Sequence, residues 1–151
     1  MPIHDIRRLG PDDLDLHARL MTLFGEAFED PATYTGARPG PDHVRKLLND
    51  QGFVALIALS DGAVIGGLAA YELVKFERER SEFYIYDLAV AAGFRRKGVA
   101  TALIGRLRGI ASERGAHVIF VQADQGDGSA IALYEGLGIR EDVLHFDIPA
   151  P

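Results

Sequence analysis

Three adjacent cations stand at the head of the segment 94–104, FRRKGVATALI. Arg95, Arg96 and Lys97 are followed at once by a glycine, and an apolar helical pattern begins after this residue, Gly98. The first N–H groups of a helix have no intrahelical partner, and a glycine lets a ligand approach the backbone closely. The turn therefore predicts an anion site with phosphate as its typical ligand. A solvated basic helix start without a ligand is the alternative.

Acidic side chains provide the complementary chemistry, because carboxylates bind protonated amines and accept protons. Asp87 interrupts the apolar run FYIYDLAV and is out of step with its neighbours there. We expect Asp87 to bind an acceptor amine and to take its proton directly or through water. A structural carboxylate bonded to backbone or to arginine is the alternative. Glu82, two residues before Tyr84, is the second candidate for the base.

The segments that must position these residues follow from local patterns of apolar and turn residues. We expect a strand at 3–9, a helix starting at 10–11, a turn-rich loop at 30–41, a short helix around 44–48, a hairpin turning at 60–62, a strand at 83–90, a helix from 99 that stops at 115, a buried strand at 117–124, a short helix at 129–138 and a last strand at 140–148. Asp12 and Asp13 fall in the first turn of the first helix. This order predicts an α/β (α+β) fold, a mixed sheet covered by helices on both faces.

The composition of the chain excludes several classes of protein and of binding partner. A chain of 151 residues is expected to form a single domain, 1–151. Its net charge of −6 argues against nucleic acid and favours a cationic small molecule. There is no cysteine, which excludes thiolate chemistry, and the five histidines show no paired spacing for a metal. No membrane-spanning run or signal core is evident, so we expect a cytoplasmic location.

Several motifs that would indicate other enzymes are missing. No GxxxxGK[ST] is present, and no GxGxxG follows a strand, which argues against the common nucleotide-binding loops. No GxSxG nucleophile elbow is present either. The sequence therefore favours a reaction without a covalent enzyme intermediate.

Three segments together resemble the GNAT superfamily of N-acetyltransferases. Arg95-x-x-Gly98-x-Ala100 is similar to the superfamily's acyl-CoA pyrophosphate loop, in which Gln or Arg precedes Gly by three residues and Gly or Ala follows two later. The run YDLAV resembles the strand before that loop. About thirty residues later, AIALYEGLGI resembles the late helix, with Tyr134 at the position of its tyrosine. Asp127 departs from the many members that have Asn before this helix.

Over nearly the whole chain the resemblance narrows to the type I aminoglycoside 3-N-acetyltransferases, the gentamicin acetyltransferases. The similar segments are FEDPATY, EFYIYDLAV, GVATALI, VQAD, ALYEGLGIRED and HFDI. The resemblance implies a mostly antiparallel central sheet flanked by helices. It also implies acetyl transfer from acetyl-CoA to the 3-amino group of the 2-deoxystreptamine ring of gentamicin-like drugs. The amine would attack the thioester directly, giving antibiotic resistance, and no metal would take part.

The resemblance also implies roles for particular residues. Tyr134 would be the acid that protonates the departing sulfur, while the base is Asp87 or Glu82, since some relatives have a carboxylate at the position of Tyr84. The residues implied for acetyl-CoA binding are Leu88, Ala89, Val90, Arg95, Arg96, Lys97, Gly98, Val99, Ala100 and Thr101. Those implied for the polycationic acceptor are Tyr84, Asp87, Asp124 and Asp147.

Two other functions stay open at this point. The same fold and co-substrate could serve a polyamine or another small amine as acceptor. A non-catalytic acyl-CoA-binding regulatory domain is the second alternative. No membrane partner is expected, and a homodimer is left open.

Overall fold

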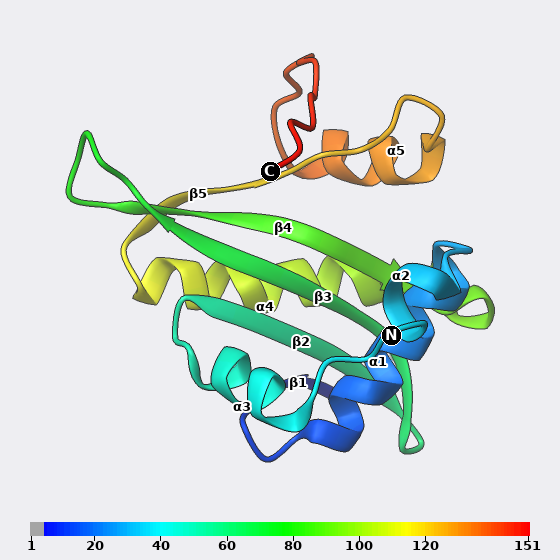
Figure 1. Ribbon diagram of the computed structural model, residues 1–151. Coiled ribbons are helices and arrows are strands. Elements are labelled where there is room, and N and C mark those ends of the chain that lie inside the picture. Colours follow the sequence, from blue (N-terminus) through cyan, green and yellow to red (C-terminus); the bar gives the residue numbers. More distant parts are fainter. Residues whose placement is uncertain (1–4) are drawn as a thin grey trace.

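Five strands form one mixed sheet in the computed structural model, which describes residues 5–151 (Figure 1). Residues 3 and 4 of the expected first strand lie outside the described residues. The strands, in sheet order, are β1 (Asp5–Arg8), β2 (Phe53–Ser60), β3 (Ala63–Val74), β4 (Ser81–Val90) and β5 (Ala116–Val121). Neighbouring strands are antiparallel except β4 and β5, which are parallel. The predicted fold class is confirmed.

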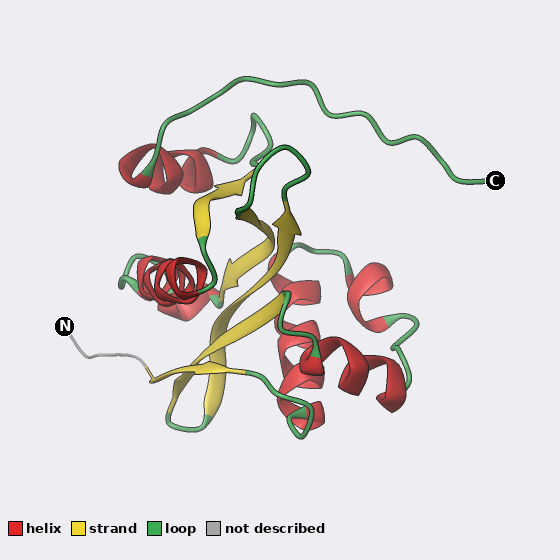
Figure 2. Cartoon of the chain, turned by 90° about the vertical axis from the view of Figure 1, so that its left-hand side faces the viewer, coloured by secondary structure: helices red, strands yellow, loops and turns green. Residues whose placement is uncertain are grey.

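Helices cover both faces of this sheet (Figure 2). On one face lie α1 (Leu14–Ala27), α2 (Pro31–Thr35) and α3 (Pro41–Asn49), and on the other lies α4 (Val99–Glu113). A short 3-10 turn, η1 (Ala92–Phe94), leads into α4, and α5 (Gly128–Leu137) follows β5. None of the described helices is long and apolar enough to cross a lipid bilayer.

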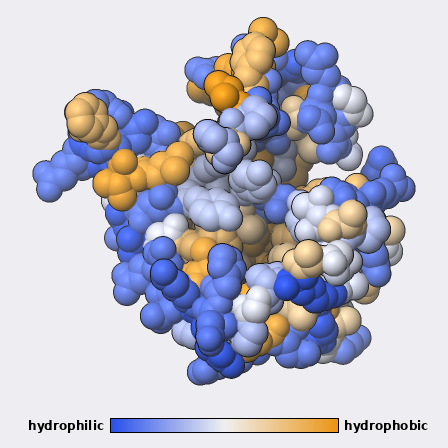
Figure 3. All heavy atoms as spheres, in the orientation of Figure 1, coloured by the Kyte–Doolittle hydropathy of each residue, from blue (hydrophilic) through white to orange (hydrophobic). Residues whose placement is uncertain are grey.

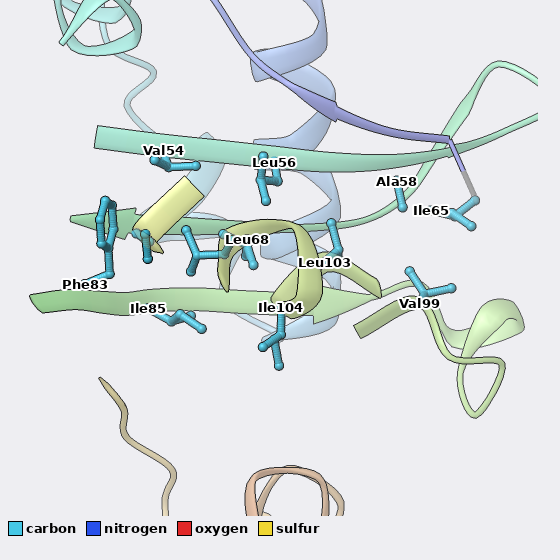
Figure 4. Packing of buried hydrophobic residues seen from close by; sticks show 13 residues of the cluster. Val54, Leu56, Ala58, Ile65, Leu68, Phe83, Ile85, Val99, Leu103 and Ile104 are labelled. Carbon is cyan, nitrogen blue, oxygen red and sulfur yellow. The ribbon is translucent and has the colours of Figure 1, made fainter. Parts of the chain in front are cut away.

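Each helical layer has its own core. The α4 side is a cluster of branched and aromatic side chains, shown in Figure 4, that includes Val54, Leu56, Leu68, Phe83, Ile85 and Leu103. The α1 side is closed by a close approach of helix to strand. A β-carbon at Gly67 of β3 would collide with the side chain of Leu20 and would lie 2.8 Å from the carbonyl oxygen of Leu56. The missing side chain therefore lets α1 lie directly on the sheet.

Three expectations about local structure were wrong. The turn-rich loop 30–41 contains α2, because Asp30 caps it and Pro31 takes its first position. The first helix begins at Leu14, since the Asp13 carboxylate accepts the Gly10 N–H at 2.7 Å and stays outside the helix. The strand at 117–124 ends at residue 121 and is not fully buried.

The predicted last strand, 140–148, was also wrong. Residues 138–151, called here the C-terminal arm, form neither helix nor strand and are exposed throughout. Figure 2 shows the arm running away from α5 as an extended chain. A strand needs a hydrogen-bonded neighbour, and within the described chain the arm has none.

Candidate active site

A β-bulge sets the direction of the candidate base. Asp87 pairs with Ala69 and Ile85 pairs with Ala70, so Tyr86 is an extra residue in β4. A bulge bends the strand and interrupts the regular alternation of side chains between the two faces. Asp87 therefore faces the layer that contains α1 and α2, as its partner Ala69 does.

The two hydrophobic cores, one on each face of the sheet, show that the alternation of β4 side chains shifts by one residue at the bulge. Before the bulge, Phe83 and Ile85 pack in the α4 cluster, and after it Leu88 and Val90 do so. Ala89 packs in the cluster of the α1 side. An acidic residue that looks out of step in the sequence thus keeps out of the α4 core.

Tyr34 of α2 completes the immediate surroundings of Asp87. Its hydroxyl donates a hydrogen bond of 2.8 Å to Asp87 Oδ1, and its ring packs against Phe24 and Phe28 of the α1 region. Burial raises the pKa of Asp87, and the hydrogen bond from Tyr34 opposes that rise. Burial and the bond to Asp87 raise the pKa of Tyr34 as well, which keeps its proton on the phenol. Asp87 is thus a half-buried carboxyl group with a fixed donor.

An aromatic strip runs across four strands on the same side as Asp87. It consists of Phe53, Tyr71, Tyr84, Tyr86 and Phe120, with successive ring centroids 4.7–6.0 Å apart. Tyr84 and Phe120 are stacked, and the Tyr84 hydroxyl donates to Gln122 Oε1 at 3.1 Å. Figure 3 shows that the surface is hollowed between the α5 side and the α2 side of the molecule. Aromatic faces attract ammonium groups, so the strip suits a cationic ligand.

The basic turn has an open helix end. Gly98 has a left-handed backbone, φ 82°, and no side chain caps α4. The first helical bond runs from Ala102 N–H to Gly98 C=O at 3.0 Å, which leaves the amides of Val99, Ala100 and Thr101 without an intrahelical acceptor. Arg95 is held at the turn, because its Nε donates to the carbonyl of Val90 at 3.1 Å. These amides and the neighbouring cations fit an anion such as a pyrophosphate.

The two parallel strands separate beside this turn. The last pair between them is Ile85 with Val121, while β4 continues to Val90. The β5 side of 86–90 therefore has no strand partner within the described chain, and this stretch starts at the bulge. Leu88, Ala89 and Val90 thus lie between Asp87 and the basic turn. Backbone groups here are free to bond an extended ligand.

Tyr134 of α5 lies partly buried against the α4 core. Burial, and to a smaller extent the charge of Asp127, raises the pKa of Tyr134. Its phenol therefore holds its proton through neutral pH. Asp127 is the N-cap of α5 and accepts the Ala130 N–H at 3.2 Å, a role that an asparagine would also fill.

The other candidate carboxylates lie apart from Asp87. Glu82 sits toward the start of β4, where His117 Nε2 is 2.9 Å and Lys75 Nζ is 3.5 Å from its carboxylate. The contact with His117 is the main reason that the pKa of Glu82 is lowered. Asp124 is exposed in the loop after β5. Asp147 is in the C-terminal arm, next to His145 Nε2 at 2.9 Å.

Sequence reasoning missed Tyr34 and the aromatic strip. A signal for Tyr34 existed, since Asp30 followed by Pro31 is a typical helix start and the helix so marked contains the tyrosine. The strip had no comparable signal, because its members come from four strands and meet only through the register of the sheet.

Comparison with known proteins bears on this arrangement. Residues 17–139 match the model of the acetyltransferase (GNAT) family. The chain belongs to this family. The GNAT fold is thus shown, and among the described residues no group of three or more His, Cys, Asp or Glu could hold a metal ion.

Solved structures match nearly the whole length of the chain. One is an aminoglycoside acetyltransferase, HMB0005, from an uncultured soil metagenomic sample. It is 55% identical, with a TM-score of 0.97, and the match covers 99% of this chain and 100% of the other. Another is the aminoglycoside acetyltransferase meta-AAC0020, also from a soil metagenome, in complex with sisomicin. It is 33% identical, with a TM-score of 0.89 and coverage of 98% and 97%.

The curated relatives that match are less similar in sequence than these two structures. The chain is 26% identical over 129 residues to the probable N-acetyltransferase family 8 member 5 of Mus musculus. This match covers 85% of the chain and 56% of the relative, so the chain spans about half the length of the curated relatives it matches.

Proposed function

We propose that this GNAT chain transfers an acetyl group from acetyl-CoA to the 3-amino group of the 2-deoxystreptamine ring of gentamicin-like aminoglycosides, and so confers resistance. The observation that carries the proposal is the position of Asp87. A half-buried carboxyl group lies on an aromatic strip suited to cations, a few residues along β4 from an open helix end suited to phosphates. The similarity to two aminoglycoside acetyltransferases, one with bound sisomicin, supports the acceptor class.

The residues present fit acetyl-CoA, which would supply the activated acetyl group. The amides of Val99, Ala100 and Thr101, with Arg95, Arg96 and Lys97, would hold its pyrophosphate. Gly98 leaves room for that approach because it has no β-carbon. The free side of β4 at Leu88, Ala89 and Val90 would bond the extended arm of the co-substrate. This direction of binding points the thioester toward Asp87 and the aromatic strip.

In the reaction, a new bond forms between the amine nitrogen and the acetyl carbon while the carbon–sulfur bond breaks. Most of the free amine is protonated at pH 7, so a proton must first leave the nitrogen. Asp87 takes this proton, directly or through water. Tyr134 gives a proton to the departing sulfur, and the raised pKa of its phenol keeps that proton available.

Asp87 is a better base than Glu82. The Glu82 carboxylate is engaged by His117 and Lys75 and its pKa is lowered, so its affinity for a proton is weak. The pKa of Asp87 is raised by burial, which brings it nearer to the working pH. Tyr84 and Tyr86 would pack against the drug, and Asp124 would add negative charge to the rim of its site.

Thiol release from acetyl-CoA tests this function across sisomicin, gentamicin, fortimicin, kanamycin, spermidine and a protein-tail peptide. We expect turnover with sisomicin, gentamicin and fortimicin. NMR of the product should place the new acetyl group on the 3-amino group. Preferential turnover of spermidine would show that the acceptor is a polyamine. Acetylation of another ring amine would contradict the proposed specificity for the 3-amino group. Binding of CoA without turnover of any acceptor would identify a regulatory domain.

A further inference from the structure

A pocket of about 410 Å³ adjoins the basic turn, on the face of the sheet that α1 covers. It lies between the second half of α1, the start of β3 and the chain that follows β4. Volumes of roughly 300–1,000 Å³ are typical of sites for small molecules. Of the described residues that line it, none belongs to the aromatic strip, and Asp87 is not among them. The pocket is therefore separate from the proposed acceptor site.

Small apolar side chains account for the space in this pocket. Alanines line it on all three sides, with Ala27 on α1, Ala63 on β3, and Ala91 and Ala92 after β4. Longer side chains at these positions would fill the gap between the helix and the loop, as close packing does elsewhere in proteins. Leu23, which is buried, also lines the pocket. The wall is thus mostly apolar and suits the apolar body of a ligand.

Arg95 gives the pocket a free hydrogen-bonding edge. Its Nε donates to the carbonyl of Val90, which fixes the side chain and leaves Nη1 and Nη2 without a partner among the described residues. None of the ion pairs between described residues includes Arg95. A guanidinium group with two free nitrogens can bind a carboxylate through two parallel hydrogen bonds. The geometry of Arg95 therefore favours a carboxylate as the polar group of the ligand.

The other charged residues of the pocket are Arg19 and Glu26, so its wall carries two cations and one anion. Arg19 is fixed at the far end, because its Nη1 donates to the carbonyl of Gly62 at 3.0 Å. Its counter-ion Asp15 is 86% exposed, and water therefore screens this pair and leaves much of the positive charge. The net charge of the wall favours an anionic ligand, in contrast to the acidic acceptor site.

We propose that this pocket is a second binding site, for a small monocarboxylic acid with an aliphatic or aromatic body. The carboxylate pairs with Arg95, and the body lies on Leu23 and Val64 between the alanines. A single negative charge matches the excess of one cation in the wall. The site needs no contact with Asp87, so it can be filled whether or not an acceptor is bound.

A ligand in this pocket would also weaken the binding of the co-substrate. Arg95 is one of the cations proposed to hold the pyrophosphate of acetyl-CoA, and a guanidinium edge bonded to a carboxylate is no longer available to a phosphate. By thermodynamic linkage, CoA would weaken the binding of the acid by the same factor. This consequence rests on the proposed function, whereas the binding of the acid does not. The pocket would then regulate the enzyme through its co-substrate.

Calorimetry without CoA tests the site directly. The probes are 4-phenylbutyrate and hexanoate, each with its neutral amide and the corresponding primary amine as matched ligands. We expect saturable binding of one acid molecule per chain, and at least about tenfold weaker binding of the amide and the amine, since these lack the charge-assisted hydrogen bonds to Arg95. If neither acid binds, or if an amide or amine binds as well as its acid, the proposal is wrong.

Three variants test where the acid binds. Ala63→Phe fills the pocket at an exposed strand position and should abolish binding of the acid without changing CoA affinity. Arg95→Met should remove the preference for acid over amide, whereas Arg96→Met, the neighbouring cation outside the pocket wall, should retain it. Thermal unfolding by circular dichroism checks that each variant is folded. Acid binding that survives Ala63→Phe, or an acid preference that survives Arg95→Met, would overturn the proposal.

The effect on the co-substrate is measured separately, by titrating CoA into the unaltered chain with and without a saturating concentration of the acid. We expect the apparent Kd of CoA to rise when the pocket is filled. If the acid binds as proposed and the Kd of CoA stays the same, Arg95 takes no part in holding the co-substrate. That result would count against the proposed function at Arg95, while the binding site for the acid would stand.

Discussion

The hydroxyl of Tyr34 donates a hydrogen bond of 2.8 Å to Oδ1 of Asp87, across 53 positions of the sequence. It ties the short helix α2 to the bulge in β4, and it bonds the ionised form of the carboxyl group. Two opposing effects therefore set the proton affinity of Asp87: burial raises its pKa and Tyr34 lowers it. A substitution at Tyr34 should therefore change the pKa of Asp87, although Tyr34 does not itself transfer the proton.

Removing the Tyr34 hydroxyl should shift the pH dependence of the reaction. In Tyr34→Phe the pKa of Asp87 is left to burial alone and rises, so a higher pH is needed to ionise the base. The acidic limb of the kcat/KM profile should move to higher pH, with the plateau above it largely retained. Tyr71→Phe is the control, since no hydrogen bond joins that hydroxyl to Asp87. An unmoved limb in Tyr34→Phe would contradict Asp87 as the base.

Neutralising the candidate bases should distinguish between them. Asp87→Asn should lower kcat/KM for gentamicin by about 10²–10⁴-fold with unchanged CoA affinity. The kcat/KM of Glu82→Gln should stay within about twofold of that of the unaltered chain, because the Glu82 carboxylate is already engaged by His117 and Lys75. Steady-state kinetics and calorimetry with CoA measure both quantities. The reverse result would transfer the role of base to Glu82.

Asp87→Asn should also change stability with a definite sign. Because folding raises the pKa of Asp87, its contribution to stability is fully present below the unfolded pKa and is lost as the pH rises through the folded value. At pH 7 the variant should therefore be at least as stable as the unaltered chain in urea denaturation. This advantage should shrink toward pH 3.

A side chain at the head of α4 should weaken co-substrate binding. Gly98→Val places a β-branched residue at φ 82° and blocks the approach to the amides beyond it. We expect CoA affinity to fall at least about tenfold by calorimetry, which is about 1.4 kcal/mol. Gly105→Ala in the same helix is the control, since its β-carbon would meet open space. Equal affinities in two folded variants would remove the turn from the binding site.

Tyr134→Phe should lower kcat by about 10²–10⁴-fold, because it keeps the packed ring but removes the proton offered to sulfur. CoA affinity and the free energy of unfolding should change little. The alkaline limb of the kcat profile, where the phenol of raised pKa ionises, should be absent from the variant. A kcat within about twofold of the unaltered chain would leave Tyr134 as a packing residue only.

Local signals in the sequence were enough for most of the elements. The hairpin expected to turn at 60–62 has a two-residue loop, Asp61 and Gly62, and both residues have the positive φ, 49° and 79°, that such a loop requires. The glycine before α4 and the one after it, Gly98 and Gly115, likewise have positive φ. Such features depend on a few neighbouring residues, so they can be inferred without knowledge of the tertiary structure.

The set of residues that meet in the candidate site was harder to predict, because it depends on the pairing register of the strands. The identity of Asp87 as an unusual residue was visible, but its direction was decided by one extra residue opposite β3. Tyr34 reaches it from a helix that a Pro- and Gly-containing segment concealed. The arm shows the opposite case, since its sequence alternates as a strand does, yet residues 138–151 form no strand because no neighbour pairs with them within the described chain.

The bulge at Tyr86 also gives β4 a residue that its pairing with β3 does not need. Loss of the Tyr86 codon would leave Asp87 directly after Ile85 and still opposite Ala69, so regular alternation would keep the carboxyl group on the same face of the sheet. The aromatic strip would lose one ring. A substitution at Tyr86 also preserves the direction of Asp87. In this strand, therefore, a homologous sequence that is one residue shorter at this point can keep the proposed base in place on a regular strand.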